Sequence, residues 1–215
     1  MARTLAAKLA LARAVGVVSR LRGGGGTSAP GKLLVRLSPQ AISELGSRLS
    51  RGSVLISATN GKTTTATMLA SILKRAGVSL VHNRAGANMA GGIATTLLEA
   101  ARPRGGIAGE LGVFEVDEMW LEQLAGQLRP RAIALGNLFR DQLDRYGELE
   151  TIAERWQRTL REHAQAQLVL NADDPLVADL AREQPTALYF GVDDSSLALP
   201  GLAHAADAKH CRRCG

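Results

Sequence analysis

The sequence predicts an α/β fold: a mainly parallel sheet flanked by helices. Short apolar runs such as residues 54–56, 111–116 and 133–135 alternate with longer segments whose apolar residues recur at helical spacing. Polar motifs begin where these apolar runs end, which is where ligands bind in parallel sheets. We therefore expect βαβ units with a binding site along one edge of the sheet.

The expected elements alternate along the chain as βαβ units require. Ser38 and Pro39 are predicted to open a helix through Leu49, with Ser38 as the N-cap and Pro39 at the first helical position. The expected strands are then 54–56, 78–81, 111–116, 132–136, 168–170 and 187–190, and the expected helices are 62–73, 89–101, 118–128, 148–164 and 175–182.

Residues 1–36 differ from the rest of the chain in charge. The net charge is +6, and this segment contains Lys and Arg but no Asp or Glu. An amphipathic helix over residues 1–22 and a flexible linker over residues 23–31 are expected. A basic arm suits nucleic acid or an anionic membrane surface, and a solvated helix face is an equal alternative.

The chain shows no sign of a membrane span or of a disulfide framework. No apolar run is long enough to cross a bilayer, so no transmembrane segment is expected. Its two cysteines are Cys211 and Cys214. These observations predict a protein of the reducing cytoplasm.

Residues 57–65, S-A-T-N-G-K-T-T-T, have the context of a phosphate-binding loop, with a strand before them and a helix after them. Backbone N–H groups at the helix start favour anions, Gly61 permits close approach, and Lys62 reaches the terminal phosphates. Thr63 offers a hydroxyl to Mg²⁺. The expected cofactor-binding residues here are Ala58, Thr59, Asn60, Gly61, Lys62, Thr63 and Thr64.

The loop resembles that of the Mur ligase family, although Ala58 stands where the family usually has glycine. Further similar stretches are N-R-A-G-A-N at 83–88, F-E-V-D-E at 114–118, N-L-F-R-D-Q-L-D-R-Y-G-E at 137–148, L-N-A-D-D-P at 170–175 and the final cysteine pair. Within that family the chain is most similar to the ligase-like subunits of lipid II isoglutaminyl synthases. The resemblance covers about residue 30 to the end.

The resemblance implies ATP and Mg²⁺ as cofactors, with Lys62 and Glu115 as catalytic residues. Thr63 and Glu115 are the expected magnesium ligands, since Mg²⁺ binds carboxylates together with phosphate oxygens. Asp117 could assist, whereas Glu118 is interpreted as part of a solvated acidic cluster at a helix start. Gln142 replaces a family histidine, which weakens a second metal site; Asp141 and Asp144 either orient that loop or cap a helix.

Three further sites are implied in the same way. Asn171 and Asp173 are expected near the base and ribose, with Asp174 capping the next helix. Asn83, Arg84 and Asn88 are expected to face substrate. Cys211 and Cys214 would supply half of a structural Zn²⁺ site that begins a zinc-ribbon insertion. His204 and His210 are local candidates for the other ligands, but neither is expected to bind the metal.

The resemblance implies two parts: a basic N-terminal helix and Gly-rich linker at 1–36, and a Mur ligase-type central ATP-binding domain at 37–215, incomplete at its C-terminal end. The implied reaction activates the α-carboxyl of D-glutamate in the lipid II stem peptide as an acyl phosphate. Ammonia from a GatD-like glutamine amidotransferase subunit would then displace phosphate. The lipid II substrate lies at the inner membrane face, where the chain would be peripheral, and no nucleic-acid partner is implied.

Two alternatives remain open: another Mur ligase-type enzyme that adds an amino acid, and an inactive nucleotide-binding fragment. Even if the chain is part of an enzyme that amidates lipid II, these 215 residues are expected to lack ligase activity by themselves.

Overall fold

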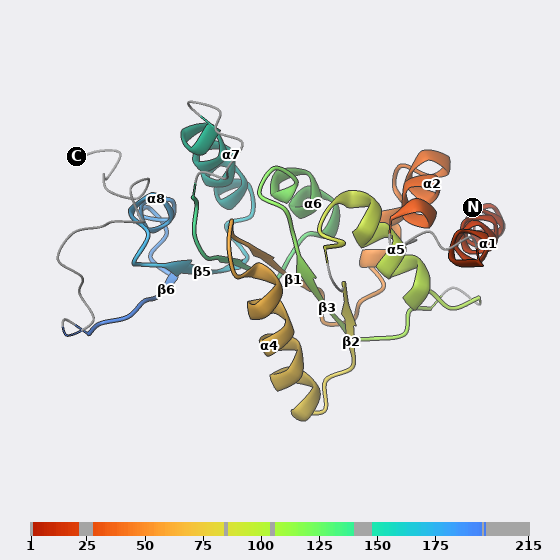
Figure 1. The fold of residues 1–215 in the computed structure, drawn as a ribbon, viewed down its shortest axis with the longest axis horizontal. Coiled ribbons are helices and arrows are strands. Elements are labelled where there is room, and N and C mark those ends of the chain that lie inside the picture. The colour runs from red at the N-terminus through yellow and green to blue at the C-terminus, as the bar shows by residue number, and fades with distance from the viewer. Residues whose placement is uncertain are drawn as a thin grey trace.

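A computed structural model describes residues 2–21, 28–83, 86–103, 106–139, 148–194 and 196. In this part of the chain, six strands form one parallel sheet in the order β2-β3-β1-β4-β5-β6 (Figure 1). The predicted parallel sheet is therefore confirmed. The strands are β1 (Ser53–Ser57), β2 (Leu80–His82), β3 (Leu111–Glu115), β4 (Ala132–Leu135), β5 (Gln167–Asn171) and β6 (Leu188–Phe190).

Helices cover both faces of the sheet, with α4 on one side and α5 to α8 on the other (Figure 1). The described helices are α1 (Ala2–Leu21), α2 (Ala29–Leu37), α3 (Ala41–Gly46), α4 (Lys62–Arg75), α5 (Ala90–Ala100), α6 (Leu121–Leu128), α7 (Glu148–Glu162) and α8 (Pro175–Asp179).

The sheet separates two hydrophobic cores. The larger one contains Leu55, Phe114 and Ile133 from the strands and Trp156 from α7, all fully buried. On the opposite face, the smaller one packs Ala66 of α4 against the strand residues Ile56, Leu111 and Val113 and against Val78, which precedes β2. Central strands are buried on both faces, which explains why β1 and β3 are nearly continuous apolar runs in the sequence.

The N-terminal helices depart from the sequence prediction. Helix α2 begins at Ala29, inside the stretch expected to be a linker, and its Leu34 is buried in the larger core. Ser38 is the C-cap of α2 and not the N-cap of the next helix; α3 begins at Ala41 with Gln40 as its N-cap. A residue before proline avoids helical geometry, and Ser38 is accordingly extended at φ −146° and ψ 89°, so α2 ends there.

Helix α1 is attached to the rest of the fold through Leu9 and Ala12, which are buried in the larger core, and through Arg13. Its guanidinium donates to the carbonyl oxygens of Leu98 and Ala101 at the C-terminal end of α5. These carbonyls lack partners within their own helix, so a cation there is favourable. Within the described ranges, no helix is long and apolar enough to span a membrane.

Candidate functional site

A loop between β1 and α4 occupies the centre of the sheet's carboxyl edge. Gly61 adopts φ +83°, a left-handed conformation that side-chain-bearing residues rarely take. This turn starts α4 at Lys62. The first N–H groups of a helix have no partner within it and carry partial positive charge, so the loop and helix start suit an anion such as phosphate.

Asn137 lies two residues after the end of β4 and holds this loop in place. Its main-chain oxygen accepts from Thr59 N at 2.8 Å. Its side-chain amide accepts from Asn60 N at 2.9 Å and donates to Asn60 O at 3.1 Å. The neighbouring Gly136 leaves room for Ala58, since a Cβ on Gly136 would lie 2.8 Å from the Ala58 Cβ. Sequence reasoning placed Asn137 in a motif but missed this role.

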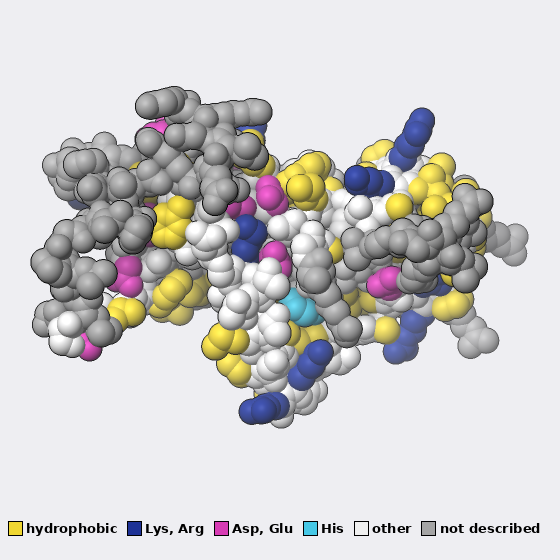
Figure 2. Space-filling model, viewed as in Figure 1, with side chains coloured by type: hydrophobic (Ala, Val, Ile, Leu, Met, Phe, Trp, Pro, Cys, Tyr) yellow, Lys and Arg dark blue, Asp and Glu magenta, His cyan; other side chains and the backbone are white. Residues whose placement is uncertain are grey.

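Lys62 lies over the loop with its ammonium group engaged on several sides. Its Nζ donates to Ala58 O at 2.6 Å, to Thr59 O at 3.2 Å and to the Glu118 carboxylate at 3.1 Å. The exposed fractions of the Lys62 and Glu118 side chains are 13% and 14%. Glu118 is thus no member of a solvated cluster, as the sequence suggested, but the ion-pair partner of Lys62. Figure 2 shows a basic side chain between acidic ones where α4 meets the sheet.

Glu115 ends β3 beside the loop and is 2% exposed. Its backbone register pairs it with Ile56 of β1, two residues before Ala58. The side-chain amide of Asn88 donates to Oε1 at 3.4 Å. Among the described residues, no cluster of three or more His, Cys, Asp or Glu suits a metal ion. A cation here would therefore need oxygens from a ligand in addition to Glu115, as Mg²⁺ does with phosphates.

Asn83 positions Glu115 and does not face an open pocket. Its side chain is 1% exposed. Its amide oxygen accepts from Glu115 N at 2.9 Å, and its amide nitrogen donates to Glu115 O at 2.8 Å and to Ala87 O at 2.9 Å. Strand β2 ends at His82, so the Asn83 side chain makes the backbone hydrogen bonds to Glu115 that a longer β2 would make. Of the residues expected to face substrate, Asn88 is half-buried beside Glu115, and Arg84 lies outside the described residues.

The segment after β5 combines a helix cap with exposed polar groups. Asp174 caps α8 as predicted: its Oδ1 accepts from Leu176 N at 2.9 Å and Val177 N at 3.2 Å. Its Oδ2 also accepts from Leu138 N at 2.8 Å, which joins α8 to the loop after β4. Asn171 Oδ1 accepts from Asp173 N at 3.0 Å. Asp173 is exposed and its Oδ2 accepts from Val192 N at 2.9 Å.

The model of the Mur ligase middle domain matches residues 56–210, most of the chain and all of this site. The chain belongs to the Mur ligase family. Among its curated relatives, the MurT subunit of lipid II isoglutaminyl synthase (glutamine-hydrolyzing) from Staphylococcus aureus strain N315 is 32% identical over 213 residues, or 95% of this chain and 45% of that protein. The corresponding subunit from Streptococcus pneumoniae is 34% identical over 177 residues, or 82% of this chain and 38% of that protein.

Solved structures of Mur ligases share the fold of this domain. The MurF ligase from Thermotoga maritima, solved in complex with ADP, superposes with a TM-score of 0.59 at 23% identity, covering 77% of this chain and 37% of that one. This likeness shows the fold alone. The chain spans less than half the length of the curated MurT relatives it matches.

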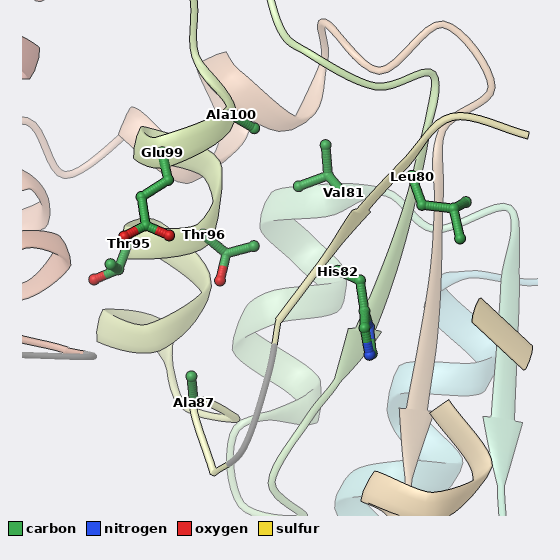
Figure 3. A pocket seen from close by; sticks show the side chains of 8 residues that line it. All are labelled: Leu80, Val81, His82, Ala87, Thr95, Thr96, Glu99 and Ala100. Carbon is green, nitrogen blue, oxygen red and sulfur yellow. The ribbon is translucent and has the colours of Figure 1, made fainter. Parts of the chain in front are cut away.

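Two of the cavities of this domain lie along the sheet on either side of the strand that leads into the loop between β1 and α4. One, of about 310 Å³, lies at the carboxyl ends of β5 and β6 and is lined by Asp173, Tyr189 and Phe190 among others. The other, of about 480 Å³, lies between edge strand β2 and α5 (Figure 3). It is bordered by His82, whose ring bonds Val113 O at 2.9 Å, and by Ala87 of the loop expected to face substrate.

Several expected site residues lie outside the described residues. They are Arg84, Asp141, Gln142, Asp144, His204, His210, Cys211 and Cys214. The second-metal and zinc expectations therefore stay predictions, as does the zinc-ribbon insertion that Cys211 and Cys214 would begin.

Proposed function

We propose that this Mur ligase domain binds ATP with Mg²⁺ along the carboxyl edge of its sheet. The observation that carries the proposal is the loop 57–62, which brings a left-handed Gly61, a helix start and Lys62 to within reach of Glu115. The triphosphate would lie on the loop. The base and ribose would extend across β4 toward Asn171, Asp173 and the cavity beside β6.

The charges of the site suit magnesium as well as phosphate. Glu115 is buried with one long amide hydrogen bond from Asn88, and a buried carboxylate needs a partner for its charge. With the Thr63 hydroxyl and phosphate oxygens, it would complete an oxygen shell of the kind that Mg²⁺ prefers. The bound ion would neutralise charge on the phosphates, while Lys62 and the α4 N-terminus stabilise the transferring phosphoryl group.

The relatives point to the reaction that the nucleotide drives. We propose that a carboxylate oxygen of the acceptor attacks the γ-phosphorus and ADP leaves, giving an acyl phosphate. An amine then attacks the carbonyl carbon, and phosphate leaves with one former carboxylate oxygen. The names of the MurT relatives support lipid II as the acceptor and glutamine as the source of ammonia. We propose that a GatD-like partner subunit delivers this ammonia. A structural zinc site that includes Cys211 and Cys214 belongs to the same proposal.

Amino-acid addition is the second candidate, because UDP-N-acetylmuramoylalanine–D-glutamate ligase from Methylococcus capsulatus is 34% identical over 140 residues, or 65% of this chain. Lipid II labelled with ¹⁸O in the D-glutamate α-carboxyl separates the two. With ATP, magnesium, the amidotransferase subunit and glutamine, the first proposal expects an amide product and ¹⁸O in the released phosphate. UDP-N-acetylmuramoylalanine labelled with ¹⁸O in its alanine carboxyl tests the second candidate, which expects ¹⁸O in the released phosphate when D-glutamate and ATP are added.

The nucleotide step is tested on the chain itself by replacing Lys62. Lys62→Ala should weaken Mg-ATP binding at least about tenfold, because an ammonium contact to phosphate is lost. Isothermal calorimetry gives the two dissociation constants. Lys74→Ala is the matched control, since Lys74 is exposed in the last turn of the same helix. Equal affinities for parent and Lys62→Ala would remove the loop from the nucleotide site.

A further inference from the structure

The ammonium group of Lys62 has no N–H left for a phosphate in this structure. An ammonium carries three donors, and Lys62 Nζ has three acceptors: Ala58 O, Thr59 O and Glu118 Oε2. The two carbonyls belong to the loop and hold the lysine over it. The Glu118 carboxylate, at 3.1 Å, approaches from the segment after β3 and carries the charge that a phosphate would bring.

Glu118 is held in this position from a second helix. Trp156 of α7 is fully buried, and its indole Nε1 donates to Glu118 O at 3.0 Å. The backbone of Glu118 is thereby fixed between the end of β3 and α7. Because Lys62 and Glu118 are each less than 15% exposed, water screens their attraction less than on an open surface.

We propose that Glu118 is a positioning residue that takes the place of phosphate on Lys62 while the site is free of nucleotide. This inference rests on the proposed nucleotide function. A polyphosphate that reaches Lys62 must displace or share this carboxylate and meets two acidic side chains, Glu115 and Glu118. Magnesium offsets part of that repulsion, so Glu118 makes the loop discriminate against nucleotides that arrive without the metal.

The test compares binding of ADP with and without magnesium to the 215-residue chain. Glu118→Gln keeps the shape and the backbone contact with Trp156 but removes the charge. It should bind metal-free ADP, measured in EDTA by calorimetry, about tenfold more tightly than the parent does. Affinity for Mg-ADP should change much less. If Glu118 had only a structural role, its replacement would weaken ADP binding. The direction of the change in affinity therefore decides between a structural role and the proposed one.

Glu122→Gln is the matched control, because Glu122 lies one turn further along and pairs only at 3.9 Å with Arg155 and Arg158. It should leave both affinities unchanged. Trp156→Phe is a second variant that removes the N–H donor to Glu118 O with no change of charge. It should shift metal-free ADP binding in the same direction as Glu118→Gln, by a smaller factor.

Three results would overturn the proposed role of Glu118. Unchanged or weaker metal-free ADP binding by a folded Glu118→Gln, with normal Mg-ADP binding by the parent, overturns the role of Glu118 alone. Absence of Mg-ADP binding by the parent overturns the proposed nucleotide site, and this inference with it. Circular dichroism reports folding; if neither Glu118→Gln nor Trp156→Phe folds, Glu118 is a structural residue and the proposal falls.

Discussion

The buried carboxylate of Glu115 is the residue on which the proposed magnesium site depends. Glu115→Gln keeps its volume and its hydrogen bond to Asn88 but removes the charge. We expect the magnesium concentration needed for half-maximal ATP binding to rise about tenfold or more, because a neutral amide oxygen is a weaker ligand for a hard cation. Metal-free nucleotide binding should change less. A magnesium titration of nucleotide binding measures both.

Asp117→Asn is the control for that experiment. Asp117 lies two residues away, but its Oδ1 accepts from Met119 N at 3.1 Å and so closes a local turn. Its replacement should leave the magnesium titration unchanged. If Asp117→Asn raised the magnesium requirement as much as Glu115→Gln, the site would not depend on Glu115 in particular.

The residues whose place in the fold the sequence predicted correctly are those set by local structure. Gly61 and Lys62 follow from a strand, a turn and a helix within ten residues, and Asp174 from the cap-and-proline pattern before α8. The roles of Glu118 and Asn83 could not be predicted in this way. Lys62 and Glu118 are 56 positions apart, and Asn83 and Glu115 are 32 apart, so their contacts depend on which strands are neighbours.

At the scale of helices and strands, capping rules succeeded where tertiary packing agreed with them. Asp174 and Ser38 both precede a proline, yet only Asp174 caps a following helix. Ser38 ends α2 because Leu34 is buried in the core and holds that helix in place up to the residue before Pro39. The local pattern is the same, and the burial of an upstream residue decides between a helix start and a helix end.

The cap at Asp174 also supports the candidate site, which gives a stability prediction. Asp174→Ala removes acceptors for three N–H groups: those of Leu176, Val177 and Leu138. We expect the free energy of unfolding to fall by about 2–4 kcal/mol, combining a lost cap with a buried unsatisfied donor. Urea unfolding followed by circular dichroism measures it.

The neighbouring aspartate serves as the control for this measurement. Asp173 is exposed and accepts one hydrogen bond, from Val192 N. Asp173→Ala should cost less than about 1 kcal/mol, as exposed polar contacts usually do. Similar losses for the two variants would mean that the connection from Asp174 to the loop after β4 adds nothing to stability.

For the whole molecule, the parallel sheet explains why motifs far apart in sequence meet. All strands point the same way, so the segments after β1, β3, β4 and β5 reach one edge. Alternating apolar runs predict this much from sequence. The strand order, which puts β3 and β4 on either side of β1, decides that Glu115 and Asn137 flank the loop. Short apolar strands carry no signal of their neighbours, so that arrangement could not be read from the residues.

This shared edge links nucleotide binding to the stability of the domain as a whole. A ligand that binds only the folded chain raises its unfolding free energy by mass action, by about 2.7 kcal/mol at a concentration 100 times the dissociation constant. For a chain of this size that corresponds to an increase of about 5–10 °C in Tm. We expect Mg-ATP at that excess to produce such an increase in differential scanning calorimetry. Lys74→Ala should retain it, and Lys62→Ala should lose about half of it or more at the same ATP concentration, because a tenfold weaker affinity leaves about 1.4 kcal/mol. An equal increase in Lys62→Ala would show that ATP stabilises the domain from a site other than the loop after β1.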